Sequence, residues 1–472
     1  ERGIDFYSSE NCTISNNHIT SSSYAYYAYM IYNESWGSNA VINNNYIENA
    51  VSSFDSLQCN FYTSSGNSYD PYRIRCIYVN DPVEIKSNTL LQHQYYRGEV
   101  IRVYQDNNAL DLTIENNHIE LYSQYDWEDD QNAAIYLTNQ NNANTLIKNN
   151  NIEIYNGANK GIYARYSSNT DIIDNTISYS DRYSWQCGLN QYGNNLAAIV
   201  VDDSDHHIIR GNTITNFAKG IEMSNSTDNI VDSNYIYTVS DYLLPTNYTQ
   251  NFSDNYGIYA NNSDSLFITN NSIKTGSGTL IYQTNGASTI KYNLLETESG
   301  RGIWCENQAG VEFSNNTLVS TNGSGDYGMY ISNLSAPIIK NNIIDNFQNG
   351  IYVDNTVINY AIQYNDIWDV SGSEYSGSAL PPLIGSYIAL NNNGDNSDIY
   401  GNISLDPLFD ANASNSYSLQ LTSPCIDAGD PNSTYDADST IADMGAFPSV
   451  FYGCVDSTAF NYDSTATVDD GS

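Results

Sequence analysis

The hexapeptide Ile209-Arg210-Gly211-Asn212-Thr213-Ile214 decides the fold, because the chain repeats its pattern thirteen times. Each copy has an aliphatic or Phe residue, two polar residues, Asn, one further residue, and Ile or Leu. Neighbouring copies are 22 to 43 residues apart, and a minimal period with longer excursions indicates one supersecondary unit per repeat. The repeated asparagines are Asn17, Asn45, Asn88, Asn117, Asn150, Asn175, Asn212, Asn234, Asn271, Asn293, Asn316, Asn342 and Asn365.

The spacing inside the hexapeptide predicts two short strands joined by a bend. Ile209 and Ile214 lie five positions apart, so one straight strand would place them on opposite faces. Asn tolerates the left-handed backbone region, so a bend at Asn212 lets both side chains point inward. A further short strand precedes most copies, as in Gly161-Ile162-Tyr163-Ala164. Two or three such strands complete one coil, and the apolar spacing favours strands over helices.

Successive coils must stack so that equivalent strands pair in parallel, about 4.8 Å apart. The corner asparagines then form a row in which each amide bonds the next, which satisfies polar groups at a buried bend. This pattern resembles the right-handed parallel β-helix repeat proteins that bacteria secrete. The resemblance predicts an all-β solenoid of about 13 or more coils with an Asn ladder and a C-terminal cap. Handedness follows from the resemblance and from the rule for parallel crossovers.

The regular pattern predicts a β-helix over residues 1–375. Residues 376–449 resemble the closing segment of secreted bacterial β-helix proteins, with the expected role of covering the last coil. Residues 450–472 resemble the start of a short Cys-bounded module found in secreted marine bacterial proteins, where the sequence DDGS is followed by Cys. Both resemblances imply export.

The charge balance excludes some partners and favours others. The chain has 16 Lys plus Arg against 54 Asp plus Glu, a net charge of −38, so it will not bind nucleic acid or an anionic membrane without bridging cations. No run of about 20 apolar residues is present to span a bilayer. Only 15% of residues are charged and 43 are Tyr. Such a neutral, polar exterior suits contact with polysaccharide or with other copies of the chain.

Cysteines and aspartates give two candidate features. Cys59 and Cys76 flank one long insertion. Two hypotheses remain for this pair: a disulfide that closes the insertion, or two free thiols. Asp430, Asp436, Asp438 and Asp443 have the spacing of a looped, oxygen-rich Ca²⁺ site, or of a solvated acidic turn.

The densest ionisable cluster is Asp202, Asp203, Asp205 and His206, with Arg210 close behind. Paired carboxylates on this scaffold resemble those of polygalacturonase-type hydrolases, in which one acid protonates the leaving oxygen and the other activates water. The alternative is an ordinary bend, because Asn225-Ser226-Thr227-Asp228-Asn229 occupies the equivalent position one coil later.

Aromatic clusters follow several of the repeated phrases and predict a binding face. Because all of them leave the coil at the same corner, stacking should bring them to one side. Packing of these segments on each other is the open alternative. The residues are Tyr24, Tyr26, Tyr27, Tyr95, Tyr96, Tyr122, Tyr125, Trp127, Tyr179, Tyr183 and Trp185.

Together these features predict a secreted or cell-surface structural or adhesive β-helix protein without enzymatic activity. It would present a Tyr-rich side to polysaccharide or to other copies, with fibre formation as a further expectation, and would bind Ca²⁺ structurally. The alternative is a carbohydrate-active enzyme, a hydrolase or lyase of acidic polysaccharide, because the scaffold itself hosts both classes.

Overall fold

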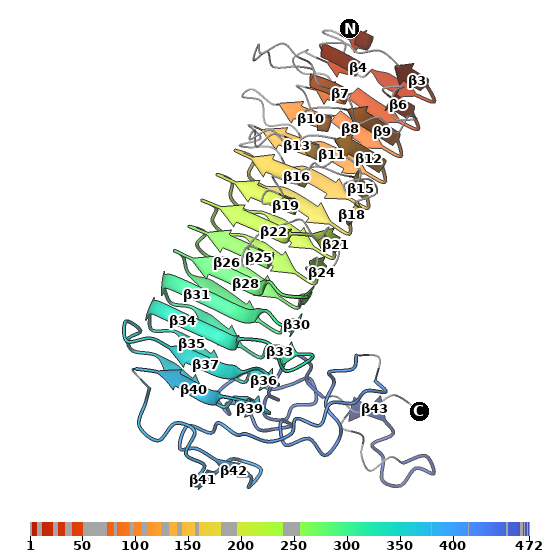
Figure 1. Ribbon diagram of the computed structural model, residues 1–472. Helices are drawn as coiled ribbons and strands as arrows, with labels where there is room; N and C mark the ends of the chain where they lie inside the picture. The colour runs from red at the N-terminus through yellow and green to blue at the C-terminus, as the bar shows by residue number, and fades with distance from the viewer. Residues whose placement is uncertain are drawn as a thin grey trace. The chain divides into compact units, whose positions relative to one another are not determined.

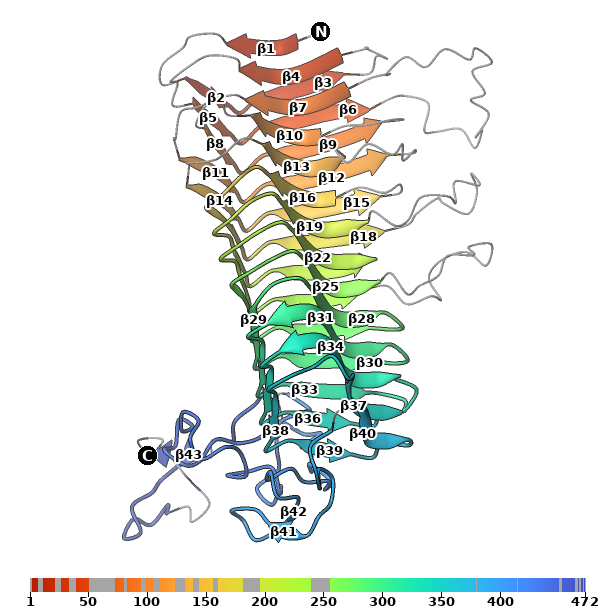
Figure 2. The same ribbon diagram turned by 90° about the vertical axis from the view of Figure 1, so that its left-hand side faces the viewer.

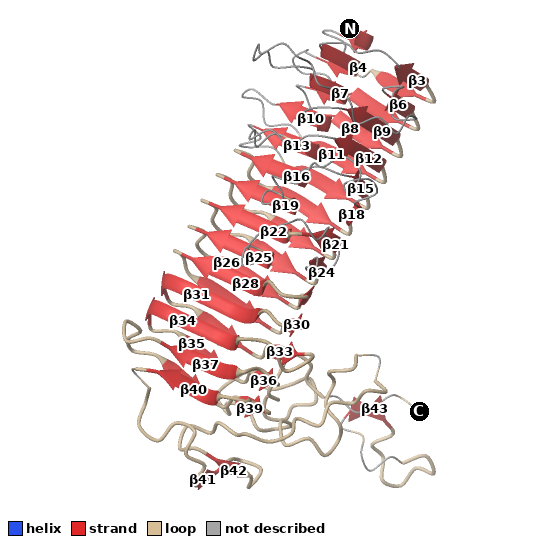
Figure 3. Cartoon of the chain, in the orientation of Figure 1, coloured by secondary structure: helices blue, strands red, loops and turns tan. Residues whose placement is uncertain are grey.

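The computed structural model describes residues 2–6, 12–21, 27–33, 40–50, 73–79, 83–94, 99–104, 111–123, 132–138, 144–155, 160–180, 196–238, 255–378, 380–413, 415–449, 452–462, 466, 468–469 and 471. The chain divides into two compact units, Glu1–Asp264 (unit 1) and Ser265–Ser472 (unit 2). In the described part, both units consist of strands and connecting loops, as Figure 3 shows. None of it forms a helix long and apolar enough to cross a lipid bilayer.

Unit 1 is a stack of coils, and each complete coil contributes one strand to each of three parallel sheets (Figures 1 and 2). The first sheet contains β1 (Arg2–Phe6), β4 (Tyr27–Asn33), β7 (Arg73–Val79), β10 (Glu99–Tyr104), β13 (Ala133–Thr138), β16 (Lys160–Arg165), β19 (Ala197–Asp202), β22 (Lys219–Ser224) and β25 (Tyr256–Asn261). The second contains β2 (Thr13–Ser15), β5 (Ala40–Asn43), β8 (Val83–Lys86), β11 (Leu112–Glu115), β14 (Thr145–Lys148), β17 (Thr170–Ile173), β20 (Ile208–Arg210) and β23 (Ile230–Asp232). The third contains β3 (His18–Ser21), β6 (Tyr46–Ala50), β9 (Thr89–Gln94), β12 (His118–Ser123), β15 (Asn151–Tyr155), β18 (Thr176–Ser180), β21 (Thr213–Phe217) and β24 (Tyr235–Thr238).

Unit 2 repeats this arrangement. Its first sheet contains β28 (Thr279–Thr284), β31 (Arg301–Ala309), β34 (Tyr327–Ser335), β37 (Asn349–Val353) and β40 (Ser373–Gly377). Its second contains β26 (Leu266–Thr269), β29 (Ser288–Lys291), β32 (Glu312–Ser314), β35 (Ile338–Lys340) and β38 (Ala361–Gln363). Its third contains β27 (Ser272–Thr275), β30 (Leu294–Thr297), β33 (Thr317–Ser320), β36 (Ile343–Asp345) and β39 (Asp366–Trp368). Two short pairs follow, β41 (Ala389–Leu390) with β42 (Asn396–Ser397), and β43 (Tyr452–Gly453) with β44 (Val468–Asp469).

The core of each unit lies inside its coils. Ile209 and Ile214 are both fully buried, which confirms that the two aliphatic residues of the hexapeptide point inward on either side of the bend. Equivalent positions pair in register, as Ile214 with Ile236 shows. Each coil therefore covers the apolar residues of the coil before it, and this burial is the main stabilising term of such a stack.

The repeated asparagines form a hydrogen-bonded ladder in each unit. The Nδ2 of Asn212 donates to Oδ1 of Asn234 at 3.0 Å, and its backbone N donates to the same oxygen. Equivalent bonds join successive members from Asn17 to Asn234 in unit 1 and from Asn271 to Asn365 in unit 2. The predicted ladder is confirmed within both units.

One detail of the bend differs from the prediction. The left-handed residue is the one before the ladder asparagine, as at Gly211, Asn149 and Asn315, with φ of 66°, 52° and 52°. The physical reason is that the ladder side chain must align with the stack and also bond carbonyls of its own bend. The preceding residue therefore makes the turn and leaves the ladder residue free to point along the stack.

The coil pattern of unit 2 continues beyond the boundary predicted at residue 375. Asn365 donates from Nδ2 to Oδ1 of Asn402 at 3.1 Å, and Ile403 forms a parallel bridge with Asp366. Asn402 then donates to buried Asp398 through both its backbone N and its Nδ2, each at 3.0 Å. Asp398 ends the ladder because a carboxylate accepts hydrogen bonds and donates none.

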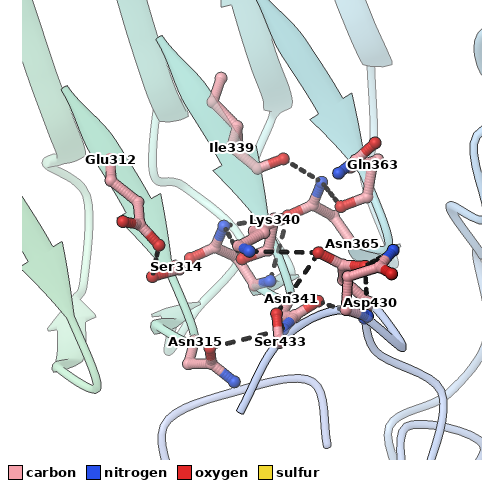
Figure 4. A network of polar contacts seen from close by, with 12 residues as sticks. Glu312, Ser314, Asn315, Ile339, Lys340, Asn341, Gln363, Asn365, Asp430 and Ser433 are labelled. Carbon is pink, nitrogen blue, oxygen red and sulfur yellow. Dashed lines mark hydrogen bonds and ion pairs between the residues drawn. The ribbon is translucent and has the colours of Figure 1, made fainter. Parts of the chain in front are cut away.

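The remainder of the predicted cap, residues 403–446, packs along the outer face of the third sheet of unit 2. Ile343 of β36 joins a buried cluster with Leu419, Cys425 and Met444. The backbone N of Ala446 donates to Thr317 Oγ1 at 2.9 Å. At the adjoining bend, Lys340 and Asn341 contact Asp430, as Figure 4 shows. This segment therefore covers the side of the coils. The role predicted for residues 376–449, covering the last coil, stays a prediction.

Candidate functional site

The predicted catalytic cluster lies where β19 turns into β20, and its members pair with neighbouring coils. Asp202 pairs with Arg165 at 3.4 Å in the coil before. The other four each contact the residue 22 positions later: Asp203 with Asn225 (3.1 Å), Asp205 with Thr227 (2.7 Å to the backbone N), His206 with Asp228 (3.5 Å) and Arg210 with Asp232 (2.9 Å).

The backbone of this segment also follows the pattern of the next coil. Asp203 and His206 have φ of 49° and 62°, and their equivalents Asn225 and Asp228 have φ of 50° and 54°. The geometry thus favours the bend reading, in which these polar residues hold one coil on the next.

His207, the next residue, is completely buried in the interior of unit 1. Its Nδ1 lies 3.3 Å from the carbonyl oxygen of Thr170, and its backbone N donates to Oδ1 of Asn229. Burial lowers the pKa of its imidazole from 6.5 to about 4. The folded protein therefore holds His207 neutral at a pH where the unfolded chain would protonate it.

We expect this histidine to make unit 1 acid-sensitive. Because its folded pKa lies below its unfolded value, its contribution is unchanged above about pH 6.5 and is lost as the pH falls toward 4, at a cost of roughly 3 kcal/mol. His207→Asn places the residue of the next coil, Asn229, at this position. Urea unfolding from pH 7 to 4 should show a smaller loss of stability in this variant than in the wild type. Equal losses would contradict the prediction.

Only part of the predicted tyrosine face lies within the described residues. Tyr122 stacks on Tyr155 of the next coil, with ring centroids 4.2 Å apart. Tyr179 contacts Phe217 at 6.0 Å. Both contacts correspond to the packing alternative. Of Tyr27 the structure describes only the backbone, in β4. The remaining predicted residues lie outside the described residues, and their grouping stays a prediction: Tyr24, Tyr26, Tyr95, Tyr96, Tyr125, Trp127, Tyr183 and Trp185.

A different aromatic row lies on the outer face of the first sheet. It occupies the position that follows the inward-pointing aliphatic residue, as Tyr163 follows Ile162. Because side chains alternate along a strand, this position faces outward. The sequence signal was present in the triplets Gly161-Ile162-Tyr163, Gly302-Ile303-Trp304 and Gly328-Met329-Tyr330. The outer row comprises Tyr32, Tyr78, Tyr136, Tyr163 and Tyr259 in unit 1, and Tyr282, Trp304, Tyr330 and Tyr352 in unit 2.

In unit 1 much of the outer row is buried and accompanied by cations. Tyr136 and Tyr163 stack at 5.0 Å and are almost completely buried. Arg102 lies over the Tyr136 ring, 4.7 Å from its centroid. Buried Glu99 pairs with both Arg75 and Arg102 at 2.6 Å, and these two guanidiniums lower its pKa against the opposing effect of burial. This part of the row acts as packing between coils.

In unit 2 the outer row is half-exposed. Trp304 stacks on Tyr330 with ring centroids 3.9 Å apart, and Tyr330 stacks on Tyr352 at 4.6 Å with the planes 7° apart. Tyr327 contacts Tyr330 and Tyr352 edge-on at 5.7 Å. We call Trp304, Tyr327, Tyr330 and Tyr352 the aromatic stack.

The geometry of the aromatic stack determines what a ligand could contact. The faces of Tyr330 are taken up by Trp304 and Tyr352. Arg301 lies over the Trp304 ring, 4.4 Å from its centroid. Beyond Tyr352, the next position in register is Ser376, which has no ring. A ligand lying along the stack would therefore contact ring edges and phenol hydroxyls, and only the Tyr352 face toward Ser376 has no aromatic neighbour in the row.

The predicted Ca²⁺ ligands each bond other protein groups. Asp430 pairs with Lys340 at 3.1 Å. Asp436 accepts a bond from the backbone N of Asp443, and Asp438 accepts one from Thr440 Oγ1. Over the described residues, no three His, Cys, Asp or Glu side chains are grouped so that they could hold a metal ion. Each of the four aspartates thus accepts bonds from nearby donors, and Ca²⁺ binding by this group or elsewhere stays a prediction.

Cys76 does not support the predicted disulfide. It is a free, fully buried cysteine whose Sγ lies 4.0 Å from the carbonyl oxygen of Leu91. Its predicted partner Cys59 lies outside the described residues. Cys76 follows the pattern of Cys305, which is also free and completely buried in the first sheet. The free-thiol reading is therefore favoured for Cys76.

Comparison with protein families identifies the handedness of the coil. The family profile described as the right handed beta helix region matches residues 188–327 and 251–404. The chain is a right-handed parallel β-helix protein. This confirms the predicted fold class, including the handedness taken from the resemblance.

Solved β-helix structures are similar to this one at low sequence identity. Pectate lyase Pel9A is 11% identical, with a TM-score of 0.40 over 87% of this chain and 88% of that one. The Dettilon tailspike protein is 12% identical, with a TM-score of 0.37 over 78% of this chain; the β-helix protein spans 62% of the tailspike's length. The mannuronan C-5 epimerase AlgE6 A-module of Azotobacter vinelandii is 11% identical, with a TM-score of 0.30 over 81% and 91% of the two chains. Comparison with curated protein sequences finds no match.

Proposed function

We propose that this β-helix protein is a secreted or cell-surface adhesive protein that binds polysaccharide along the first sheet of unit 2. The observation that carries the proposal is the aromatic stack, because Trp304, Tyr330 and Tyr352 place half-exposed rings in register on three successive coils. Amphipathic rings with a polar tip are enriched at recognition surfaces, since one end is apolar and the other forms hydrogen bonds.

The periodicity of the stack matches a polymer better than a small molecule. Parallel coils repeat at about 4.8 Å, so a chain lying along the stack would meet the same edge at every coil. Phenol hydroxyls can both donate and accept hydrogen bonds with sugar hydroxyls. The Tyr352 face next to Ser376 offers one place for a sugar ring to stack.

The charges near the stack favour a neutral polysaccharide. The indole Nε1 of Trp304 donates to Glu306, and Arg301 pairs with Asp326 at 3.4 Å. Asp354 accepts hydrogen bonds from Thr356 and from the backbone N of Asn333. The surroundings thus carry one cation and several carboxylates, and the chain as a whole has a charge of −38, which repels polyanions.

Affinity electrophoresis or glycan-array binding with the purified chain tests the proposal. Trp304→Ala and Tyr352→Ala should each weaken binding to a neutral polysaccharide by tenfold or more, consistent with loss of an aromatic anchor. The matched control is Phe267→Ala, because Phe267 is 48% exposed and lies in the second sheet of the same unit. Binding that Phe267→Ala weakens as much as Trp304→Ala does would contradict the proposal.

Product analysis of the same glycans separates adhesion from turnover. Shortened or unsaturated glycan products that form only with the intact protein would show that it is a hydrolase or lyase, which would overturn the adhesive function. Sedimentation of the wild type and Trp304→Ala separates glycan binding from self-association. Assembly that is lost in Trp304→Ala, without glycan binding by the wild type, would assign the stack to contacts between copies.

A further inference from the structure

Residues 403–446, which we call the strap, cover the outer face of the third sheet of unit 2. Ile343 is buried against Leu419, Cys425 and Met444 of the strap. Tyr417 donates from its hydroxyl to Glu296 of β30 at 2.9 Å. Asn315 Nδ2 donates to the carbonyl oxygen of Asp443. The strap therefore adds a separate layer to the four successive coils of β30, β33, β36 and β39, held by one apolar cluster and a set of polar contacts.

The interface between the strap and the coils is strongly acidic. The coils contribute Glu296 on β30, Asp345 on β36, Asp366 on β39, and Asp369, which follows β39. The strap contributes Asp406, next to Asp345 and Asp366.

Unit 2 has three lysines, and each has a specific partner. Lys291 lies over the Tyr292 ring, 4.9 Å from its centroid. Lys274 lies 3.6 Å from Glu296, and Lys340 lies 3.1 Å from Asp430. Neither ion pair involves Asp345 or Asp366. Carboxylates that are packed together without a counterion can be kept only if some of them stay protonated.

Asp366 is the most deeply buried member of this group. Its side chain is fully buried, with Oδ1 accepting from the backbone N of Leu405 at 3.1 Å and Oδ2 lying 3.2 Å from Sγ of Cys425. Both partners belong to the strap, so Asp366 is a direct link between coil and strap. The titratable groups that face it are Asp345 from β36, Asp406 and Cys425 from the strap, and Tyr375 from β40.

Asp345 lies on the neighbouring strand and is mostly buried by the strap. Asp369 follows β39, and together with Asp406 and Asp366 it places like charge around Asp345. Tyr417 also faces this group from the strap. A negative charge on Asp345 would therefore repel carboxylates on both sides of the interface.

We propose that the strap is a pH-sensitive device, held on the third sheet while Asp366 and Asp345 are protonated and released when they ionise. Release would uncover Ile343 and the outer face of the third sheet, and the Asn ladder inside the coils would stay intact. The proposal is independent of polysaccharide binding, because the aromatic stack lies on the first sheet.

The direction of the pH effect follows from the shifts of these two groups. Burial, chiefly, raises the pKa of Asp366 to about 8 and that of Asp345 to about 7, from an ordinary 3.8. A folded pKa above the unfolded value means that docking is strongest below about pH 4 and weakens as the pH rises through 7 to 8. At pH 6 both groups are largely protonated, and at pH 9 both would be ionised.

Hydrogen exchange of the full chain, followed by mass spectrometry at pH 6 and pH 9, tests this inference. After correction for the intrinsic exchange rates, peptides from residues 403–446 should lose protection at least tenfold at pH 9. Peptides from β29 to β32, residues 288–314, should change less than twofold. In Asp366→Asn the protection of the strap peptides should fall less than threefold between pH 6 and pH 9. The amide oxygen still accepts from Leu405, and the group cannot ionise.

Asp410→Asn is the control, since Asp410 lies in the strap and its carboxylate accepts a local bond from the backbone N of Asn412. It should behave as the wild type does. The inference fails if strap and coil peptides respond alike to pH, or if Asp366→Asn loses as much protection as the wild type. If the coil peptides of Asp366→Asn already exchange faster than those of the wild type at pH 6, Asp345→Asn replaces it in the test and is judged by the same criterion.

Discussion

Asn316→Ala is expected to destabilise unit 2 by about 4 kcal/mol, because buried polar groups left without partners cost about 1–3 kcal/mol each. Asn316 accepts bonds on Oδ1 from both the backbone N and the Nδ2 of Asn293, at 3.1 and 2.9 Å. Its Nδ2 donates to the carbonyl of Ile290 and to Asn342. Alanine removes all of these bonds at once and fills none of the space.

Urea unfolding followed by circular dichroism measures this effect. The matched control is Asn412→Ala, because Asn412 is exposed and its backbone N, which donates to Asp410, is unchanged by the substitution. We expect the control to stay within about 0.5 kcal/mol of the wild type, as is usual for surface changes. A loss in Asn316→Ala no larger than in the control would show that the ladder contributes little to stability.

Asp398→Asn is expected to destabilise the end of unit 2 by about 3 kcal/mol, although it introduces the residue that forms the rest of the ladder. Asp398 is buried, and its two oxygens accept four N–H bonds. These come from the backbone N of Gly385, Tyr400 and Asn402 and from the Nδ2 of Asn402. In Asn one oxygen becomes an NH₂ group, which faces two donors and can accept from neither.

The ladder is directional, which makes this result specific. Within unit 2 each ladder asparagine donates to the next, and the last one, Asn402, donates to a carboxylate that only accepts. Asp410→Asn is the control, because its remaining oxygen can still accept from Asn412. Protection of residues 396–403 in hydrogen exchange should fall in Asp398→Asn and stay unchanged in Asp410→Asn. Equal protection in the two variants would mean that donor direction at the ladder end is unimportant.

The coil, the ladder and the inward residues could be predicted because they depend on short-range rules that the chain repeats. Ile209 and Ile214 needed a bend between them to share one interior, and that requirement recurs at every copy. The ladder member Asn402 was missed because Ile403 follows it directly and Ser404 stands where the hexapeptide has Ile or Leu. Its role became visible only through its contacts with Asn365 and Asp398.

The candidate site depended on which coil lies next to which, and the sequence does not state this. Asp203 and Arg210 looked like one cluster along the chain, yet each contacts a residue 22 positions later. Tyr163 and Tyr330 occupy equivalent outer positions, and only their surroundings make one buried and the other half-exposed.

By itself the sequence determined a stacked parallel coil with an asparagine spine, since hydrophobic spacing and a repeated bend act within some 22 residues. Only the tertiary structure decided where the outer aromatic row is open, how the spine ends at Asp398, and that the strap covers acidic groups on the third sheet. The physical reason is the separation along the sequence of the residues that interact. Backbone bends and inward spacing are local, whereas burial, ring stacking and charge repulsion depend on neighbours that the stacking of coils brings together.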